Sequence, residues 1–324
     1  MKAIVQERFG PPDTLRLIET ETPDIGQGDV LVEVHAAGVN PYDWHMLRGD
    51  PRIARLMGVG LTKPKARIAG VDVAGRVLAV GTAVRDLHPG DDVFGRCRGA
   101  FADEAIGDAT LLVRKPATLS FQQAAAIPMA AVTALHAIRD SGQVRSGQRV
   151  LINGAGGGVG SFAVQIASAL GAEVTGVCSA RNVEMVTSIG AAHVIDYAAA
   201  DFADGTTQYD LVLDNVGNRS LSDLRRAVTP TGMVLLNGGG SPGRIIGAVG
   251  SLLSAAAVNL FVRQKIAFVP TRETRDDLLA VADMAEAGAL RPVIDRTFPL
   301  ADTAAALRYV EAGHTSGKVV ITVA

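Results

Sequence analysis

A glycine-rich loop between a strand-like run and a helix-like run constrains the fold of this 324-residue chain more than any other feature. The run Val150-Leu151-Ile152 is short and apolar, as in a buried strand, and residues 153–165 read NGAGGGVGSFAVQ. Within this loop, the first, third and sixth positions of a dinucleotide-binding pattern are Ala155, Gly157 and Gly160. Glycines allow the backbone to approach a pyrophosphate, and the N–H groups at a helix N-terminus attract its negative charge. We therefore expect an α/β domain that binds a dinucleotide through Ala155, Gly157, Gly158, Val159 and Gly160.

Strand-like and helix-like runs continue to alternate after this loop. The strand-like runs are 173–177, 194–195, 211–213 and 233–236, and the helix-like runs are 160–170 and 182–189. Such alternation builds a parallel, doubly wound sheet of the Rossmann type, whose ligand binds beyond the carboxyl ends of the strands. Residues 214–217 and 237–240 follow two of these ends. We expect Asn215 and Gly238 to lie at the ligand there.

The first 120 residues have a different pattern, in which short strand-like runs are separated by turns. The runs at 30–36, 71–81 and 92–94 are typical of a small β-barrel. A helical region follows from 121 to 139 with an interruption at Pro128, and a final strand-like run covers 318–321. The chain is therefore expected to be an α/β protein with two domains.

The residues after the strand-like run 173–177 indicate which dinucleotide binds. A site for NAD usually carries Asp or Glu there, which accepts hydrogen bonds from the ribose hydroxyls. This chain has Cys178-Ser179-Ala180-Arg181-Asn182, without an acid. Ser179 and Arg181 can donate to a 2′-phosphate, and Tyr197, after the next strand-like run, can cover the same phosphate. The sequence predicts NADPH as the cofactor, while Arg181 and Tyr197 are also compatible with ordinary surface positions.

Composition argues against several other classes of protein. The formal net charge of −2 argues against a binder of nucleic acid or of a membrane surface. The two cysteines, Cys97 and Cys178, provide neither a disulfide framework nor a four-cysteine zinc site. Residues 245–262 carry no charge, but their Gly, Ser and Asn favour a buried helix, a pocket wall or a subunit contact over a membrane span. The N-terminus has no signal-peptide pattern, so we expect a cytoplasmic protein.

Four motifs together resemble a known family: GVNPYD at 38–43, the glycine loop, IDY at 195–197 and GKVV at 317–320. Over essentially its whole length the chain resembles the zinc-free quinone oxidoreductases, the zeta-crystallin-like branch of the medium-chain dehydrogenase/reductase superfamily. The resemblance implies a homodimer whose chains combine a GroES-like β-barrel catalytic domain with a doubly wound Rossmann domain. The implied ranges are 1–121 for the catalytic domain, 122–262 for the Rossmann NADPH-binding domain, and 263–324 for a segment that returns to the catalytic domain.

Zinc-dependent members of this superfamily hold a catalytic zinc ion with two Cys and one His. Matching the motifs places Asn40, Val71 and Met129 at these three positions, and none of the three is a suitable zinc ligand. The resemblance therefore implies an enzyme without a metal. Because no Lewis acid polarises the substrate, its substrates should already be electrophilic, as quinones and activated alkenes are.

The resemblance also assigns residues to the site. Asn40 is expected near the nicotinamide, Thr133 at its carboxamide, and Phe268 and Lys318 at its ribose. Tyr42, Asp43 and His45 are expected near the substrate, and with Asn40 they form the expected catalytic group. Two of these residues are also compatible with a purely structural role. Asp43 can cap a helix, and His45 can be a polar residue at the rim of the site.

One departure from the family pattern bears on the substrate. Quinone reductases and the related enoyl thioester reductases usually carry a Tyr shortly after the segment that corresponds to GVNPYD, following a Gly. This chain reads Arg48-Gly49-Asp50-Pro51 there and has no such Tyr. Enoyl thioester reduction is therefore disfavoured unless Tyr42 substitutes, whereas quinone reduction can draw its protons from water. Two alternatives stay open: a 2-alkenal or γ-ketol double-bond reductase, and a non-catalytic, crystallin-like NADPH-binding protein.

Overall fold

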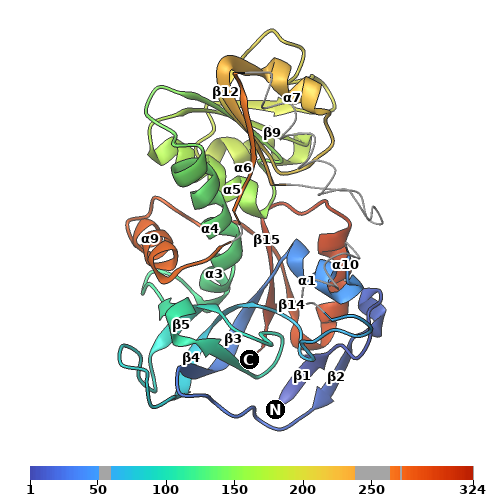
Figure 1. Ribbon diagram of the computed structural model, residues 1–324, viewed down its shortest axis with the longest axis vertical. Helices are drawn as coiled ribbons and strands as arrows, with labels where there is room; N and C mark the ends of the chain where they lie inside the picture. Colours follow the sequence, from blue (N-terminus) through green and yellow to red (C-terminus); the bar gives the residue numbers. More distant parts are fainter. Residues whose placement is uncertain (51–59, 238–262, 271, 324) are drawn as a thin grey trace. The chain divides into compact units, whose positions relative to one another are not determined.

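The computed structural model describes residues 1–50, 60–237, 263–270 and 272–323 (Figure 1). The chain forms two compact units: unit 1 comprises Met1–Val132 and Glu273–Ala324, and unit 2 comprises Thr133–Arg272. The boundaries lie about ten residues later than the 121 and 262 expected from the sequence. The helix α4 (Pro128–Leu135) contains the first boundary, so no linker marks it in the sequence.

Unit 2 is built on a six-stranded parallel sheet with the order β10-β9-β8-β11-β12-β13. Because β8 is the first strand in the chain, this order is the 3-2-1-4-5-6 arrangement of a Rossmann domain, with its switch point between β8 and β11. The predicted doubly wound α/β sheet is therefore confirmed. Its strands are β8 (Arg149–Asn153), β9 (Glu173–Cys178), β10 (His193–Asp196), β11 (Tyr209–Asp214), β12 (Val228–Leu236) and β13 (Lys265–Phe268).

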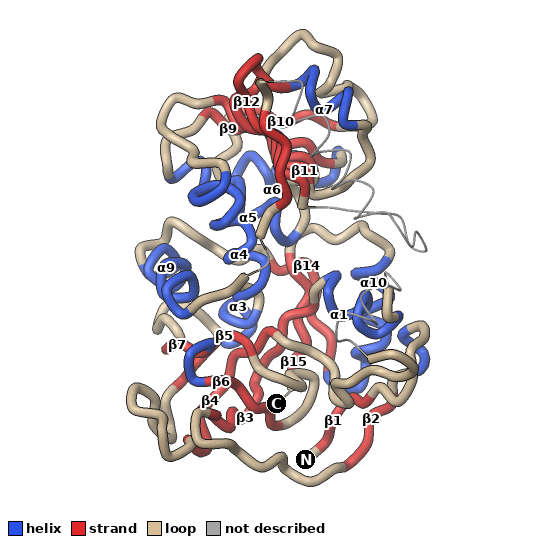
Figure 2. Tube along the Cα trace, viewed as in Figure 1, coloured by secondary structure: helices blue, strands red, loops and turns tan. Residues whose placement is uncertain are grey.

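Helices cover the strands of this sheet (Figure 2). The helices α5 (Gly158–Ala169) and α6 (Val183–Ser188) pack on β8, β9 and β10, whereas α7 (Leu221–Ala227) packs on β11 and β12. Val150, Leu151 and Ile152 of β8 are fully buried, as their continuous apolar run predicts for a central parallel strand.

Unit 1 is built on a seven-stranded, mostly antiparallel sheet. Its order is β14-β15-β3-β4-β5-β7, and β6 also pairs with β3. The strands are β3 (Asp29–Val39), β4 (Asp72–Val80), β5 (Asp92–Arg96), β6 (Glu104–Asp108), β7 (Leu112–Arg114), β14 (Ile294–Pro299) and β15 (Lys318–Thr322), beside a small pair of β1 (Lys2–Val5) and β2 (Arg16–Glu19). Its other helices are α1 (Pro41–Arg48), α3 (Phe121–Ala125), α9 (Arg275–Glu286) and α10 (Thr303–Glu311).

The C-terminal strand β15 lies beside β3, although the two strands come from opposite ends of the chain (Figure 1). The antiparallel register pairs Val319 with Val39. Lys318, the first residue of β15, therefore comes next to Asn40, the residue that precedes α1. This register brings the two ends of the chain together at the site described below.

Among the described residues, no helix is long and apolar enough to cross a membrane. The uncharged segment 245–262 and the expected ligand residue Gly238 lie outside the described residues.

Candidate active site

Four polar side chains are buried together in unit 1, where β3 ends and α1 begins. We call Asn40, Asp43, Asp72 and Lys318 the buried polar cluster, since each is at most 5% exposed. They come from α1 and its N-cap, from the first residue of β4 and from the first residue of β15. Burial of ionisable groups requires partners, so the contacts within the cluster indicate what it can do.

Asn40 is the centre of this cluster. Its backbone N–H donates to Oδ2 of Asp43 at 2.7 Å, which is half of a capping box at the start of α1. Its side-chain Nδ2 donates to Oδ2 of Asp72 at 2.9 Å, and its Oδ1 accepts from Nζ of Lys318. Both polar atoms of the Asn40 side chain are thus engaged with charged partners.

Lys318 and Asp72 form an ion pair bridged by Asn40. The Lys318 Nζ lies 4.0 Å from Oδ2 of Asp72 and also donates to the Val39 carbonyl at 3.1 Å. The same Asp72 oxygen accepts from the backbone N–H of Met129 at 3.2 Å, whereas Oδ1 of Asp72 is buried without a hydrogen-bond partner in the described part of the chain. Burial lowers the pKa of Lys318 and raises that of Asp72, while their mutual attraction opposes both shifts.

Asp43 differs from Asp72 because it has no cation within ion-pair distance among the described residues. Burial raises its pKa to about 7, against the hydrogen bond from Asn40 and the more distant charges of Lys318 and Arg96. The negative charge of Asp72 raises the pKa of Asp43 further. The Asp43 carboxyl therefore exchanges a proton close to neutral pH.

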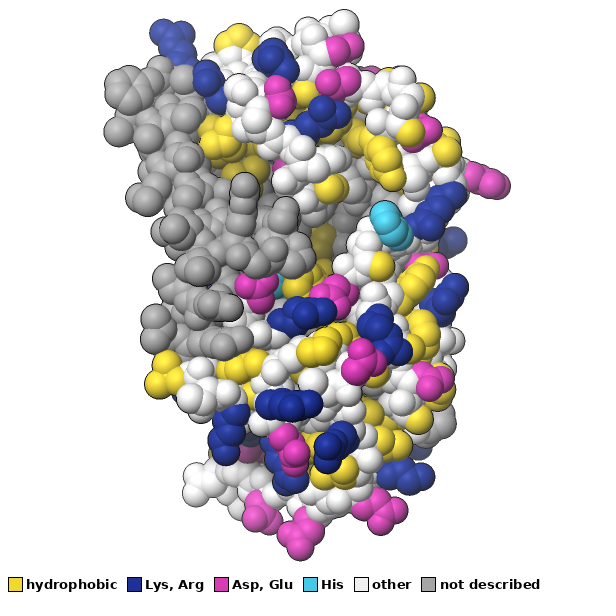
Figure 3. Space-filling view, turned by 90° about the vertical axis from the view of Figure 1, so that its right-hand side faces the viewer, with side chains coloured by type: hydrophobic (Ala, Val, Ile, Leu, Met, Phe, Trp, Pro, Cys, Tyr) yellow, Lys and Arg dark blue, Asp and Glu magenta, His cyan; other side chains and the backbone are white. Residues whose placement is uncertain are grey.

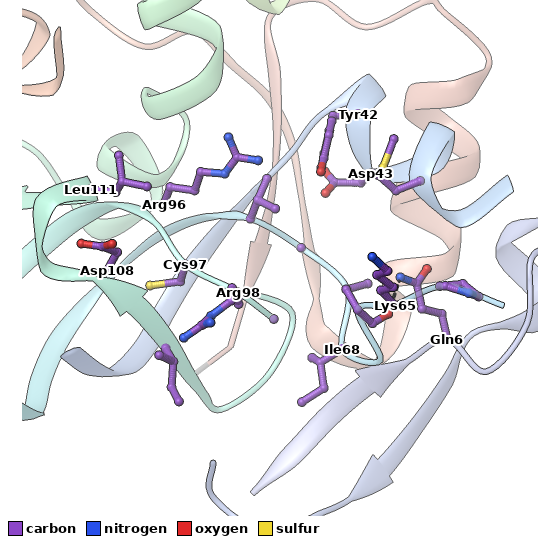
Figure 4. A pocket seen from close by; sticks show the side chains of 18 of the residues that line it. Gln6, Tyr42, Asp43, Lys65, Ile68, Arg96, Cys97, Arg98, Asp108 and Leu111 are labelled. Atoms are coloured by element: carbon purple, nitrogen blue, oxygen red, sulfur yellow. Dashed lines mark hydrogen bonds between the residues drawn. The ribbon is translucent and has the colours of Figure 1, made fainter. Parts of the chain in front are cut away.

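A cavity of about 640 Å³ in unit 1 adjoins the cluster (Figure 4). Tyr42, Asp43 and Met46 of α1 line one wall, and Arg96 at the end of β5 lines another. The Arg96 guanidinium lies 5.6 Å from the centre of the Tyr42 ring and donates to Oε2 of Glu273 at 3.2 Å. The cavity thus combines an acid, a cation and an aromatic ring, enough to orient a small polar molecule.

His45, expected with this group, does not line the cavity. Its ring stacks on Trp44, with the ring centres 3.6 Å apart, and its Nδ1 lies 3.2 Å from the carbonyl oxygen of Asp50. Burial lowers the pKa of His45. Three of the four expected catalytic residues, Asn40, Tyr42 and Asp43, therefore lie at the cluster or the cavity, and His45 lies beside them on a different face of α1.

The positions expected to bind zinc in related enzymes have other contacts here. Asn40 uses both side-chain polar atoms within the cluster, Met129 contacts Asp72 through its backbone, and Val71 lines the cavity with an aliphatic side chain. The only buried cation among the four cluster side chains is the ammonium of Lys318. These residues do not form a zinc site, because none of the three offers a thiolate or an imidazole.

The glycine loop of unit 2 has the geometry of an anion site. The first N–H groups of an α-helix have no intrahelical partner, and the N-cap of α5, Gly157, has no side chain to cap them. Gly158 and Val159 are half-exposed, whereas Ala155 and Gly160 are buried. A Cβ on Gly160 would lie 2.1 Å from the Gly154 carbonyl oxygen, so only glycine allows the helix to start this close to the strand.

Amide side chains connect the strand ends next to this loop. Nδ2 of Asn153, at the end of β8, donates to Oδ1 of Asp214 at 2.8 Å. The side chain of Asn215 donates to the Asn153 carbonyl at 3.1 Å and accepts from Nδ2 of Asn237 at 2.8 Å. Oδ2 of Asp214 is buried and has no hydrogen-bond partner among the residues that the structure describes. This network holds Asn215 at the switch point of the sheet, where a Rossmann domain binds its ligand.

The residues expected at a 2′-phosphate follow β9 and β10. Ser179 is half-buried directly after β9, and Arg181 and Tyr197 are exposed. The backbone N–H of Tyr197 donates to the Cys178 carbonyl at 3.1 Å, which brings the ends of β9 and β10 together. The neighbouring acid, Asp196, accepts from the backbone N–H of Ala198 at 3.1 Å.

The two remaining expected residues lie in unit 2. Thr133 is half-buried in α4, and Phe268 is the last residue of the edge strand β13, where it pairs with Leu236. Phe268 therefore belongs to the Rossmann sheet and not to the segment returning to unit 1, because β13 completes the parallel order of that sheet.

Two family models match this chain. The alcohol dehydrogenase GroES-like domain matches residues 26–135, and the model described as zinc-binding dehydrogenase matches residues 189–321. The mitochondrial NAD(P)H oxidoreductase RTN4IP1 of Mus musculus is 32% identical over 356 residues, which cover 100% of this chain and 89% of the relative. The chloroplastic NADPH-dependent alkenal/one oxidoreductase of Arabidopsis thaliana is 31% identical, and the match covers 99% of this chain and 79% of the relative.

A solved structure agrees with these matches. The quinone oxidoreductase from Coxiella burnetii has a TM-score of 0.87 and 29% identity, with 100% of this chain and 99% of that chain covered. The chain belongs to the medium-chain dehydrogenase/reductase superfamily. With Asn40, Val71 and Met129 at the zinc positions, it falls in the zinc-free quinone oxidoreductase branch. This medium-chain reductase is an enzyme that uses a nicotinamide cofactor.

Sequence reasoning missed several site residues of this medium-chain reductase. Asp72 and Arg96 were not among the expected residues, although each is a charged residue at the end of an otherwise largely apolar strand. Asn153 precedes the glycine loop as a polar residue ending a buried strand, which is the same signal. Nothing in the sequence around Glu273 indicates a place in the site, and only its hydrogen bond with Arg96 in the structure identifies it.

Proposed function

We propose that this protein transfers a hydride from NADPH to a quinone or to an activated alkene such as a 2-alkenal. The observation that carries the proposal is the buried polar cluster, which includes Asn40 at one of the zinc positions and lies next to a cavity with an acid and a cation. Without a metal to polarise a simple ketone or alcohol, the protein depends on substrates that already accept a hydride. The names of the similar proteins, a quinone oxidoreductase and an alkenal/one oxidoreductase, support both substrate classes.

The residues of unit 2 fit a dinucleotide. The start of α5 offers unpaired N–H groups to a pyrophosphate, and the uncapped Gly157 leaves them open. The amide network around Asn215 offers polar groups at the switch point of the sheet. When bound, the nicotinamide ring supplies the hydride. We propose that Gly238, outside the described residues, also lies against this cofactor.

We propose that the cofactor is NADPH and not NADH. No acid directly follows β9, where an NAD site usually has one, and the hydroxyl of Ser179 and the guanidinium of Arg181 stand there instead. The name of the Arabidopsis thaliana relative, an NADPH-dependent enzyme, supports the same choice. Tyr197, exposed beside the end of β9, is proposed to cover the 2′-phosphate.

We propose that the nicotinamide end of the cofactor is held by Asn40, Thr133, Phe268 and Lys318. The substrate would occupy the cavity beside Tyr42 and Asp43, where Arg96 attracts a carbonyl oxygen that gains negative charge. These residues position the acceptor and exclude water from it, which is the contribution that an electrophilic substrate requires.

The test is a comparison of acceptors under identical conditions. Loss of NADPH absorbance is followed with a small benzoquinone, a 2-alkenal, a saturated ketone and no acceptor, and each assay is repeated with NADH. We expect turnover with the quinone or the alkenal, little with the saturated ketone, and a preference for NADPH. Turnover with the saturated ketone alone would contradict the proposed substrate class. Tight binding of NADPH without turnover of any acceptor would favour the non-catalytic, crystallin-like alternative for this particular chain.

The partners and the location of the protein remain predictions. Acidic and basic side chains are intermingled on the face shown in Figure 3, which agrees with a small-molecule enzyme rather than a nucleic-acid binder. We propose a homodimer, which light scattering during gel filtration would test. A cytoplasmic location is proposed from the sequence alone, and the names of two relatives refer to mitochondria and chloroplasts.

A further inference from the structure

Asp43 occupies an unusual position between the buried polar cluster and the cavity. It is only 5% exposed and yet lines the cavity wall, beside Tyr42 and across from Arg96 (Figure 4). Its Oδ2 accepts the backbone N–H of Asn40 at 2.7 Å, and this bond fixes the side chain at the start of α1. Its Oδ1 has no hydrogen-bond partner among the described residues. One oxygen is therefore anchored, and the other is available to a molecule in the cavity.

Charged and titratable groups face Asp43 from every element around it. They are Asp72 on β4, Lys318 on β15, Arg96 on β5 with its partner Glu273, and Tyr42 on α1 itself. Burial and the charge of Asp72 favour the protonated carboxyl, whereas Lys318, Arg96 and the Asn40 N–H favour the carboxylate. Because these influences oppose one another, the pKa lies at about 7, and Asp43 can both give and regain a proton near neutral pH.

We propose that Asp43 is the proton donor of the reduction, delivering its proton to the α carbon of an activated alkene. This inference rests on the proposed function and adds to it the group that completes the reaction. Tyr42 is the other hydroxyl-bearing side chain at this wall, and its ring is engaged with Arg96. His45 does not line the cavity, so it does not reach a substrate there.

The proposed step balances without a further reactant. Hydride from NADPH adds to the β carbon of the alkene, and the electron pair of the double bond moves toward the carbonyl to give an enolate. The enolate carbon then takes the proton from Asp43, and the electrons of the broken O–H bond remain on the carboxylate. Exposed residues such as Lys65 and Arg98 line the same cavity, so water reaches it and restores the proton. A quinone differs, because its reduced oxygens can take protons directly from water.

The experiment compares Asp43→Asn with the unsubstituted protein and with Asp108→Asn, a matched change of an exposed carboxyl lining the same cavity. Asparagine still offers an oxygen to the Asn40 N–H, so the start of α1 is retained. With a 2-alkenal we expect kcat of the unsubstituted protein and of Asp108→Asn to fall as pH rises through about 7. Asp43→Asn should lose about 100-fold or more in kcat and this pH dependence, with a much smaller loss for a benzoquinone.

Two further measurements distinguish a donor from a residue that only supports the fold. Reduction of a 2-methyl-substituted cyclic enone should give one product enantiomer with the unsubstituted protein and a mixture with Asp43→Asn, because water protonates the free enolate from both faces. NMR of protein with 13C-labelled Asp carboxyls, without cofactor, should show a carboxyl titrating near 7 that Asp43→Asn removes. Tyr42→Phe should leave both the signal and the enantiomer unchanged.

The outcomes distinguish the donor role of Asp43 from the proposed function of the protein. An active protein whose Asp43→Asn variant keeps the pH dependence and the single enantiomer would overturn the donor role alone. A carboxyl signal titrating only at the ordinary Asp value near ~4 would overturn it as well, whatever the turnover. Absence of turnover with every acceptor in the unsubstituted protein would instead contradict the proposed function.

Discussion

The glycine loop of unit 2 and the buried polar cluster of unit 1 are built in opposite ways. The loop presents backbone N–H groups of consecutive residues at the start of one helix, α5. The cluster consists of side chains from separate elements, and Asn40 and Lys318 lie 278 residues apart in the chain. A site made of backbone groups is disrupted mainly by substitutions that add side-chain atoms. A site made of buried charges is disrupted by substitutions that remove one member of a charged pair.

The largest expected effect tests the cluster side of this comparison. Lys318→Met removes the cation that balances Asp72 and should lower the free energy of unfolding by about 3–5 kcal/mol near neutral pH. The double variant Lys318→Met/Asp72→Asn should regain much of the lost stability, because the Asp72 charge that lacks a partner in Lys318→Met is then absent. Urea unfolding measures both, with Lys2→Met at an exposed position as the control. A loss below about 1 kcal/mol for Lys318→Met would mean that the cluster does not depend on charge pairing.

The second effect concerns the pH dependence of stability. The pKa of Asp43 is raised from 3.8 to about 7 in the folded chain, so the folded state holds a proton that the unfolded state releases between these values. The stability that this proton provides is present below pH 3.8 and is lost as pH rises through about 7, at up to about 1.4 kcal/mol per pH unit. Asp43→Asn should therefore be more stable than the unsubstituted protein at pH 8, with a smaller difference at pH 5. Thermal unfolding of both proteins at both pH values measures this. The raised pKa would be contradicted if Asp43→Asn and the unsubstituted protein differed in stability by the same amount at pH 5 and at pH 8.

The third effect tests the backbone side of the comparison by adding one methyl group at two places in the loop. Gly160→Ala should lower the free energy of unfolding by about 1–3 kcal/mol, because the new Cβ meets the Gly154 carbonyl at 2.1 Å. Gly157→Ala should leave folding nearly unchanged, since the nearest atom lies at 3.4 Å, but should weaken NADPH binding by covering the start of α5. Thermal unfolding and NADPH titration separate the two. Equal loss of stability in both variants would show that the loop is simply intolerant of side chains.

The smallest effect concerns the choice of cofactor. Arg181→Ala should weaken NADPH binding by about tenfold, or about 1.4 kcal/mol, and should leave NADH binding within error. Arg145→Ala changes another exposed arginine of unit 2 and serves as the control. Equal weakening of both cofactors would place Arg181 away from the 2′-phosphate.

The same contrast explains how much could be predicted from the sequence. The parallel sheet, its glycine loop and α5 depend on local runs, so the pattern around Ala155 to Gly160 predicted them directly. The strand β14 was not among the predicted runs, because its charged residues Asp295 and Arg296 hide the strand pattern. It forms at Ile294–Pro299 because β15 pairs with it.

The cluster could be predicted only in part. Asn40 and Lys318 were expected at the site from motifs of the family, but nothing in either motif indicates that the two side chains touch. That contact depends on the pairing of β15 with β3, and the roles of Asp72 and Arg96 depend on the same long-range packing. Buried charged partners that are distant in the chain are therefore the part of the site that local patterns cannot supply.

The central claim is that the reductase works without zinc, because Asn40, Val71 and Met129 stand at the zinc positions and Asn40 is held in the buried polar cluster. The most direct test treats the protein with a chelator, measures its zinc content, and follows NADPH oxidation with a benzoquinone and a 2-alkenal before and after treatment. We expect less than one zinc ion per chain and the same turnover in both samples. Loss of turnover on chelation, restored by added zinc, would contradict the account.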